Sequence, residues 1–130
     1  KVIAILRHGL QADHVLLGPG SLFTSVIAAA VVPEIRTALA LTAGRVIQIA
    51  NLATEVGESE GLDGTDHLLA VLEHRIRVDT YLYDRLGPLQ TNEAYVFEHG
   101  VMPVGGELAD PGALRHDPRR LAMALGDLLS

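Results

Sequence analysis

The sequence predicts an α/β protein with a doubly wound, mainly parallel sheet and helices on both faces. Three observations predict this class: short β-branched runs alternate with longer helical patterns, the run HVLL at residues 14–17 is continuously apolar, and that run ends at a glycine. A strand buried on both faces gives such a run, and strands that alternate with helices are joined by right-handed crossovers. We expect residues 1–130 to form a single domain with a sizeable aliphatic core.

Apolar spacing and helix-terminal residues assign the elements in order. Strands are expected at residues 14–17, 45–52, 78–83 and 101–104. Helices are expected at residues 22–32, 33–41 and 92–99, and in two further segments that follow Asp63 and Asp117 as N-caps. Pro103 places the fourth strand at or near an edge of the sheet, because proline cannot donate a hydrogen bond to a neighbouring strand.

The opening segment, KVIAILRHGL, fits either a helix or a strand. Val2, Leu6 and Leu10 recur at i, i+4 and i+8, which is the spacing of one helical face. We therefore expect a helix here.

Composition excludes several classes of partner. The formal net charge is −6 and the ten lysines and arginines are scattered, so we expect no nucleic-acid binding. No apolar stretch reaches the ~20 residues of a membrane span, so we expect a soluble protein without membrane insertion. The absence of cysteine is compatible with the cytoplasm, where we place the protein. The six histidines lack zinc-site spacing and no nucleophile motif occurs, so we predict neither a metal ligand nor a catalytic residue.

The loop GPGS at residues 18–21 follows the first of these strands and opens a helix. At such a junction unpaired backbone N–H groups and the positive end of the helix dipole attract an anion. Gly18 and Gly20 carry no Cβ that would hold a phosphate away, and Pro19 stiffens the turn. Hydroxyls that would donate to phosphate or cap the helix follow at Ser21, Thr24 and Ser25. The alternative is a tight turn with a serine cap and no ligand.

The connection NLATEVGESEG at residues 51–61 is rich in polar groups. Its candidate ligand-binding residues are Asn51, Thr54, Gly57 and Glu58. The three carboxylates of this loop, those of Glu55, Glu58 and Glu60, would hold Mg²⁺ beside a diphosphate or accept hydrogen bonds from sugar hydroxyls. The alternative is a solvated acidic loop.

Two more candidates lie in the first turn of the following helix, Asp66 and His67. Asp66 is also well explained as a carboxylate that stabilises a helix N-terminus. A histidine in the position of His67 is more often a packed or capping residue than a catalytic base.

Two blocks of the sequence together resemble the gluconeogenesis-factor family, which is related to the 2-phospho-L-lactate transferases of deazaflavin cofactor synthesis. In the first block, ADHVLLGPGSLFTSVIAAAVVPEI, the family has a strand, GPGS, an aromatic residue, Thr-Ser and a helix that leads to Val-Pro; these are Gly18 to Ser21, Phe23, Thr24, Ser25, Val32 and Pro33. In the second block, VIQIANLATEVGESEGLDGTDHL, it has Asn-Leu, a GET-type tripeptide, another glycine and a helical histidine; these are Asn51, Leu52, Gly57 to Ser59, Gly61 and His67. The closing RHDPRRLAMAL is similar to the family's C-terminal helix.

The chain departs from the family pattern at three places. Ala28 stands where the family usually has proline, and Ser59 replaces the threonine of the tripeptide but keeps its hydroxyl. The glycine-rich Gly-Gly-Gly-Thr-Gly loop with which family members begin does not occur in this sequence. The chain therefore resembles the C-terminal portion of such a protein, a partial Rossmann-like domain.

The resemblance implies a regulator that binds a nucleotide-diphosphate sugar of the uridine type and acts in gluconeogenic growth, cell-wall supply and cell shape. It implies no established catalysis, and we further expect a homo-oligomer. The alternative is a transferase that moves a phospholactyl group from a guanosine-diphosphate-type donor to a deazaflavin with Mg²⁺, although scarce aromatics, 4% of the chain, disfavour a pocket for that planar acceptor. A third interpretation is a structural fragment that associates through its apolar helices.

Overall fold

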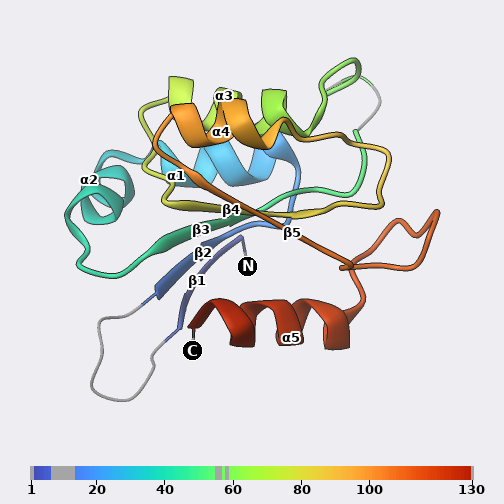
Figure 1. Cartoon of the computed structure of the whole chain (residues 1–130). Coiled ribbons are helices and arrows are strands. Elements are labelled where there is room, and N and C mark those ends of the chain that lie inside the picture. The colour runs from blue at the N-terminus through green and yellow to red at the C-terminus, as the bar shows by residue number, and fades with distance from the viewer. Residues whose placement is uncertain (1, 7–13, 55–56, 58, 130) are drawn as a thin grey trace.

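A computed structural model describes residues 2–6, 14–54, 57 and 59–129 of the protein. It contains a five-stranded sheet in the order β1-β2-β3-β4-β5 (Figure 1). The strands are β1 (Ile3–Leu6), β2 (His14–Leu17), β3 (Val46–Ile49), β4 (Thr80–Asp84) and β5 (Met102–Gly106). The helices are η1 (Leu22–Ile27), α1 (Ala28–Ala30), α2 (Pro33–Leu41), α3 (Gly64–Glu73), α4 (Glu93–Glu98) and α5 (Pro118–Leu129).

The sheet confirms the predicted fold class. The β2–β3, β3–β4 and β4–β5 pairs are parallel, and only β1 pairs in the antiparallel sense. Helices α1, α3 and α4 lie over one face of the sheet, whereas α5 lies over the other (Figure 1). Because the four parallel strands run in the same direction, their carboxyl ends and the connections that follow them meet at one edge of the sheet.

Alternating residues of each strand divide the core into two clusters. Val15 and Leu17 of β2 pack with the helices of the first face, while Leu16 between them packs with α5 on the other face. The core is mainly aliphatic as predicted, and Tyr81 and Tyr83 are buried within it. The hydroxyl of the fully buried Tyr81 donates to the Gly64 carbonyl at 2.7 Å. Burial raises the pKa of the Tyr81 hydroxyl.

The helix predicted for the opening segment is wrong. Ile3–Leu6 is a strand that pairs with β2, with Ile3 opposite Leu17 and Leu6 opposite His14. The helical spacing of Val2 and Leu6 competes with this pairing, and hydrogen bonds along the edge of β2 favour the strand. Leu10 lies outside the described residues.

The predicted helix at residues 22–32 is present as a helical run over residues 22–30, and the helix breaks before Pro33 as predicted. Its first part, η1, has π-type hydrogen bonding, α1 follows directly, and the helical run ends at Ala30. Val32 then adopts an extended conformation with ψ 124°, and Pro33 is the first residue of α2. The proline ring disfavours helical backbone at the preceding residue, which explains the break.

Helices α3 and α5 begin where the sequence predicts them. Asp63 and Asp66 form a reciprocal capping box at the start of α3. The Asp117 carboxylate accepts hydrogen bonds from the amides of Arg119 and Arg120 at 2.9 and 3.3 Å. Pro103 lies in β5, which is an edge strand as predicted.

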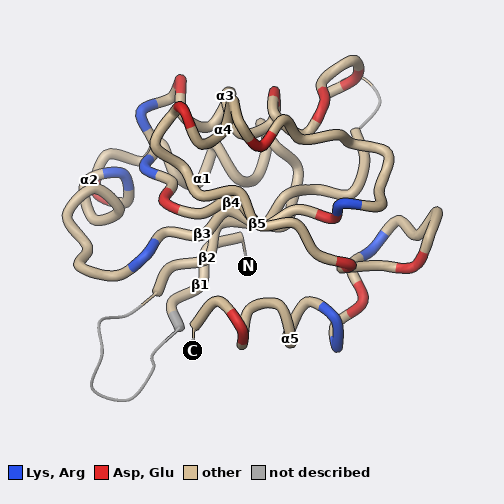
Figure 2. The backbone as a smooth tube through the Cα atoms, viewed as in Figure 1, with Lys and Arg blue, Asp and Glu red and all other residues tan. Residues whose placement is uncertain are grey.

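Charged side chains are distributed over many elements of the described chain, and Figure 2 shows separate basic positions instead of a continuous basic stripe. Within the described ranges no individual helix has the length and apolar character to cross a membrane; a bent pair, Leu22–Ala30 with Pro33–Leu41, meets these two criteria across a 72° bend.

Candidate functional site

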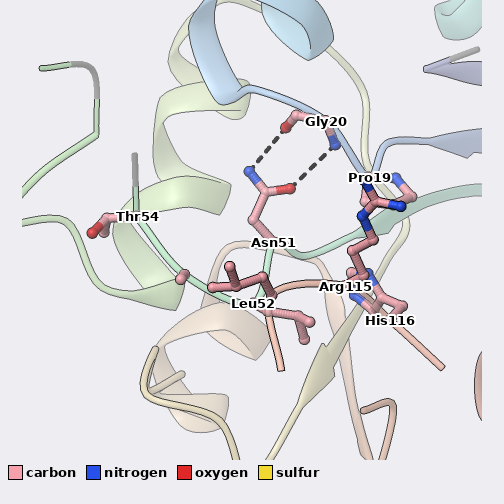
Figure 3. Close-up of a pocket in the computed structure, with 9 residues that line it drawn as sticks. Pro19, Gly20, Asn51, Leu52, Thr54, Arg115 and His116 are labelled. Atoms are coloured by element: carbon pink, nitrogen blue, oxygen red, sulfur yellow. Dashed lines mark hydrogen bonds between the residues drawn. The ribbon is translucent and has the colours of Figure 1, made fainter. Parts of the chain in front are cut away.

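A cavity of about 510 Å³ lies at the edge where the parallel strands end (Figure 3). Three connections supply its walls, those that follow β2, β3 and β5. The lining residues are Pro19, Gly20, Asn51, Leu52, Ala53, Thr54, Leu114, Arg115 and His116. A volume in this range suits a small-molecule ligand.

Gly20 and Asn51 hold the first two walls together. The Gly20 amide donates to Asn51 Oδ1 at 3.2 Å, and Asn51 Nδ2 donates to the Gly20 carbonyl at 2.8 Å (Figure 3). One side chain therefore satisfies both main-chain groups of a glycine 31 residues away. The sequence predicted that these two residues share a site, and the structure brings them together.

The unpaired amides expected at both glycines of GPGS are not present. The Gly18 amide donates to the Val2 carbonyl at 2.6 Å, and the Gly20 amide is bonded to Asn51. Both glycines are also required by packing: a Cβ on Gly18, whose φ is +80°, would lie 3.0 Å from the Ile49 carbonyl oxygen, and one on Gly20 would lie 2.8 Å from Val2 Cγ1. An anion at this loop must therefore use other donors.

Ser21, at the start of η1, and Thr24 and Ser25, within it, do not line the cavity. Ser21 occupies the N-cap position, but its side chain makes no capping hydrogen bond; its carbonyl instead accepts from the amides of Ser25 and Val26. Thr24 is exposed and Ser25 is half-buried.

Among the described residues of the acidic loop, those that line the cavity lie at its beginning. Thr54 lines the cavity, whereas Gly57, which has φ +78°, donates its amide to Glu60 Oε1 at 2.8 Å on the exposed surface. Glu55 and Glu58 lie outside the described residues. The candidate role of Glu58 therefore stays a prediction.

Asp66 and His67 belong to α3 and do not line this cavity. Asp66 completes the capping box with Asp63, as its alternative explanation predicted. His67 is buried, and its Nδ1 donates to the Asp63 carbonyl at 2.7 Å. The structure thus places His67 in the packed interior of the helix layer.

Sequence reasoning missed the third wall, formed by Leu114, Arg115 and His116. Arg115 is exposed, and its guanidinium makes no hydrogen bond or ion pair with another described residue. In Figure 3 Arg115 and His116 lie on the Pro19 side of the cavity, opposite Thr54. The signal that could have found this wall is the parallel sheet itself, because the connection after a fourth parallel strand returns to the same edge.

Hydrogen bonds hold this third connection against the sheet. Asp84 Oδ1 accepts from the Leu108 amide at 3.2 Å, and the Leu108 carbonyl accepts from the Asp117 amide at 2.7 Å. His116 Nε2 donates to the Ala50 carbonyl at the end of β3 at 3.1 Å. Burial lowers the pKa of His116, partly offset by that hydrogen bond and by Asp84, so the imidazole is neutral at neutral pH.

These features define a class of protein: a Rossmann-like α/β domain with a candidate small-molecule pocket at the carboxyl edge of its parallel strands. The sequence comparison identifies the family. Residues 4–105 match the family model for 2-phospho-L-lactate transferase CofD, and the chain belongs to this family.

Relatives of known sequence carry the name gluconeogenesis factor, in agreement with the resemblance seen in the sequence. The Halalkalibacterium halodurans gluconeogenesis factor is 41% identical over 73 residues, which cover 53% of this chain and 23% of that protein. A Deinococcus radiodurans protein also named for a gluconeogenesis factor is 33% identical over 139 residues, covering 95% of this chain and 30% of its own length.

A solved structure shares the fold. The crystal structure of a UPF0052 family member from Bacillus halodurans superposes with a TM-score of 0.79 and 27% sequence identity, and the match covers 86% of this chain and 42% of that protein. The chain thus spans about 30% of the Deinococcus relative and 42% of the solved one.

Proposed function

We propose that the pocket binds a nucleotide-diphosphate sugar of the uridine type, and that the protein is a regulator of gluconeogenic growth, cell-wall supply and cell shape. The observation that carries the proposal is Arg115, a guanidinium without a protein partner among the described residues, in the wall of a pocket of about 510 Å³. Guanidinium binds phosphate oxygens through two parallel N–H groups, so a diphosphate is a fitting occupant.

The remaining walls offer the other contacts that such a ligand needs. Pro19, Leu52 and Leu114 present apolar surface suited to the faces of a base or sugar ring. Thr54, at the opposite end from Arg115 in Figure 3, offers a hydroxyl to sugar or ribose oxygens.

The family relationship supports the biological part of the proposal. Relatives that match this chain are named gluconeogenesis factors. Because the chain spans only part of their length, the activity of the whole protein, its self-association as a homo-oligomer and its cytoplasmic location belong to the proposal.

A second candidate function is favoured by the family model, which is named for 2-phospho-L-lactate transferase and matches residues 4–105. Such an enzyme would move a phospholactyl group from a guanosine-diphosphate-type donor to a deazaflavin, with Mg²⁺. Within the described residues no group of three or more histidine, aspartate or glutamate side chains forms a metal site, and Glu60 is already bonded to Gly57. No transfer step is assigned to these residues.

Titration calorimetry with a uridine-diphosphate sugar tests the binding proposal. We expect Arg115→Ala to weaken binding by about tenfold or more, as expected for loss of a charge-assisted hydrogen bond. Arg36→Ala on α2 removes the same charge away from the pocket and should bind as the wild type does. Equal affinity of the wild type and Arg115→Ala would contradict the proposal, whereas Mg²⁺-dependent release of guanosine monophosphate with a deazaflavin acceptor would favour the transferase.

A further inference from the structure

The oxygen and the nitrogen of the Asn51 carboxamide each make a hydrogen bond to the protein backbone. Its Oδ1 accepts from the Gly20 amide at 3.2 Å and its Nδ2 donates to the Gly20 carbonyl at 2.8 Å. A carboxamide has one oxygen and one NH₂ group side by side, which matches the N–H and C=O of a single residue. Aspartate would place a second acceptor against the Gly20 carbonyl and repel it.

The backbone next to Asn51 is held in place by hydrogen bonds. The preceding residue, Ala50, donates its amide to the Leu82 carbonyl at 2.8 Å and accepts from His116 Nε2 at 3.1 Å. Ala50 is buried. Asn51 thus extends from a point held by β4 on one side and by the third pocket wall on the other.

On the side that faces Asn51, Gly20 has little other restraint. Gly20 is half-buried and contacts Val2 from the opposite direction, where an added Cβ would lie 2.8 Å from Val2 Cγ1. Glycine backbone is conformationally permissive, so a loop with two glycines needs an external contact to keep one geometry. The same loop places Pro19 in the pocket wall.

We propose that Asn51 is a positioning residue: it sets the shape of the pocket by clamping Gly20 and does not contact the ligand itself. This inference rests on the proposed function for its ligand, but the clamp is a property of the ligand-free protein. Without the clamp the loop at residues 18–21 is free to move, so the affinity of the pocket falls by a common factor for every ligand. If Asn51 contacted the ligand directly, its loss would lower the affinity only for ligands that carry the contacted group.

Two measurements on the wild type and on Asn51→Ala test the proposal. The first is amide hydrogen exchange of Gly20 by NMR without ligand, where we expect exchange about fivefold faster or more in the variant, the factor that corresponds to the ~1 kcal/mol of one hydrogen bond. The second is calorimetric binding of inorganic pyrophosphate, uridine diphosphate and a uridine-diphosphate sugar, whose affinities should all fall by a similar factor. Asn51→Asp, which keeps the acceptor for the Gly20 amide, should show an intermediate exchange rate. It replaces Asn51→Ala in the test if that variant does not fold.

The matched control is Asn92→Ala. The Asn92 side chain caps α4 by accepting from the Tyr95 amide at 3.1 Å and does not line the pocket, so its loss lowers stability without altering Gly20 exchange or binding. Unchanged Gly20 exchange in both Asn51 variants would overturn the proposal, as would a loss confined to the sugar-bearing ligand. If the wild type binds none of the three ligands, the proposed function fails, while the exchange rates still decide whether the clamp exists.

Discussion

His116 Nε2 donates a hydrogen bond to the carbonyl of Ala50, 3.1 Å away and 66 residues earlier in the chain. The bond joins the connection after β5 to the end of β3, and it places Arg115 beside the loop that carries Pro19. Since a carbonyl only accepts, the imidazole must carry its proton on Nε2. The candidate pocket is therefore assembled by contacts between segments that are distant in sequence.

This histidine predicts a pH dependence of stability. Burial lowers the pKa of His116 in the folded protein below its ordinary value of 6.5, so the unfolded chain binds the proton more readily. The contribution of neutral His116 is present above pH 6.5 and is lost as the pH falls below it. We expect the difference in free energy of unfolding between the wild type and His116→Gln to shrink on acidification, as measured by urea denaturation. A difference independent of pH would contradict the assignment.

Tyr83 provides a second test at alkaline pH. Its hydroxyl donates to the Glu93 carboxylate, and burial together with this bond raises the pKa of Tyr83 to about 12. The stabilising effect of the protonated hydroxyl is present below pH 10 and is lost as the pH rises through about 12. We expect Tyr83→Phe to lower the free energy of unfolding by about 1 kcal/mol at neutral pH. Tyr95→Phe, at an exposed ring on α4, should have almost no effect.

Two glycine-to-alanine substitutions in helices should change the stability of the protein in opposite directions. A Cβ on Gly64 would lie 2.9 Å from the Gln90 carbonyl oxygen, whereas one on Gly126 meets no atom within 4 Å. We expect Gly64→Ala to destabilise by about 2 kcal/mol through overpacking, and Gly126→Ala to stabilise by roughly 0.5–1 kcal/mol because alanine favours the helix. Thermal unfolding of both variants measures the contrast. Stabilisation by both would show that Gln90 does not pack against α3 as described.

Arg77 should be a stabilising residue far from the pocket wall. Its guanidinium donates to the carbonyls at the end of α2 and in the turn after it, those of Leu39, Thr42 and Gly44, at 3.1, 2.8 and 3.2 Å. It also pairs with Asp79 at 2.9 Å. Lysine cannot reproduce this planar set of donors, so Arg77→Lys should lower the free energy of unfolding by about 2 kcal/mol in urea denaturation. Arg75→Lys, exposed and two residues away, should be neutral.

Part of the lining of the candidate site was predictable because a parallel sheet gathers its connections at one edge. Pro19, Gly20, Asn51 and Thr54 were predicted from the loops after the first two parallel strands, and all four line the cavity. Ser21, Thr24 and Ser25 were predicted from the same segment but lie at the start of η1 or within it, outside the lining. Spacing along the chain identifies the loop and does not tell which of its side chains turn toward the cavity.

Local sequence patterns were enough to predict the alternation of strands and helices, the N-caps Asp63 of α3 and Asp117 of α5, and the positions of β2 and β3. These depend on periodicity and capping, which act within a few residues. Three features became apparent from the three-dimensional structure: Ile3–Leu6 is a strand, the glycine amides of GPGS are bonded to Val2 and Asn51, and Arg115 reaches the pocket. Each of these depends on hydrogen bonds and packing between segments distant in the sequence, whose relative positions are set only when the sheet assembles.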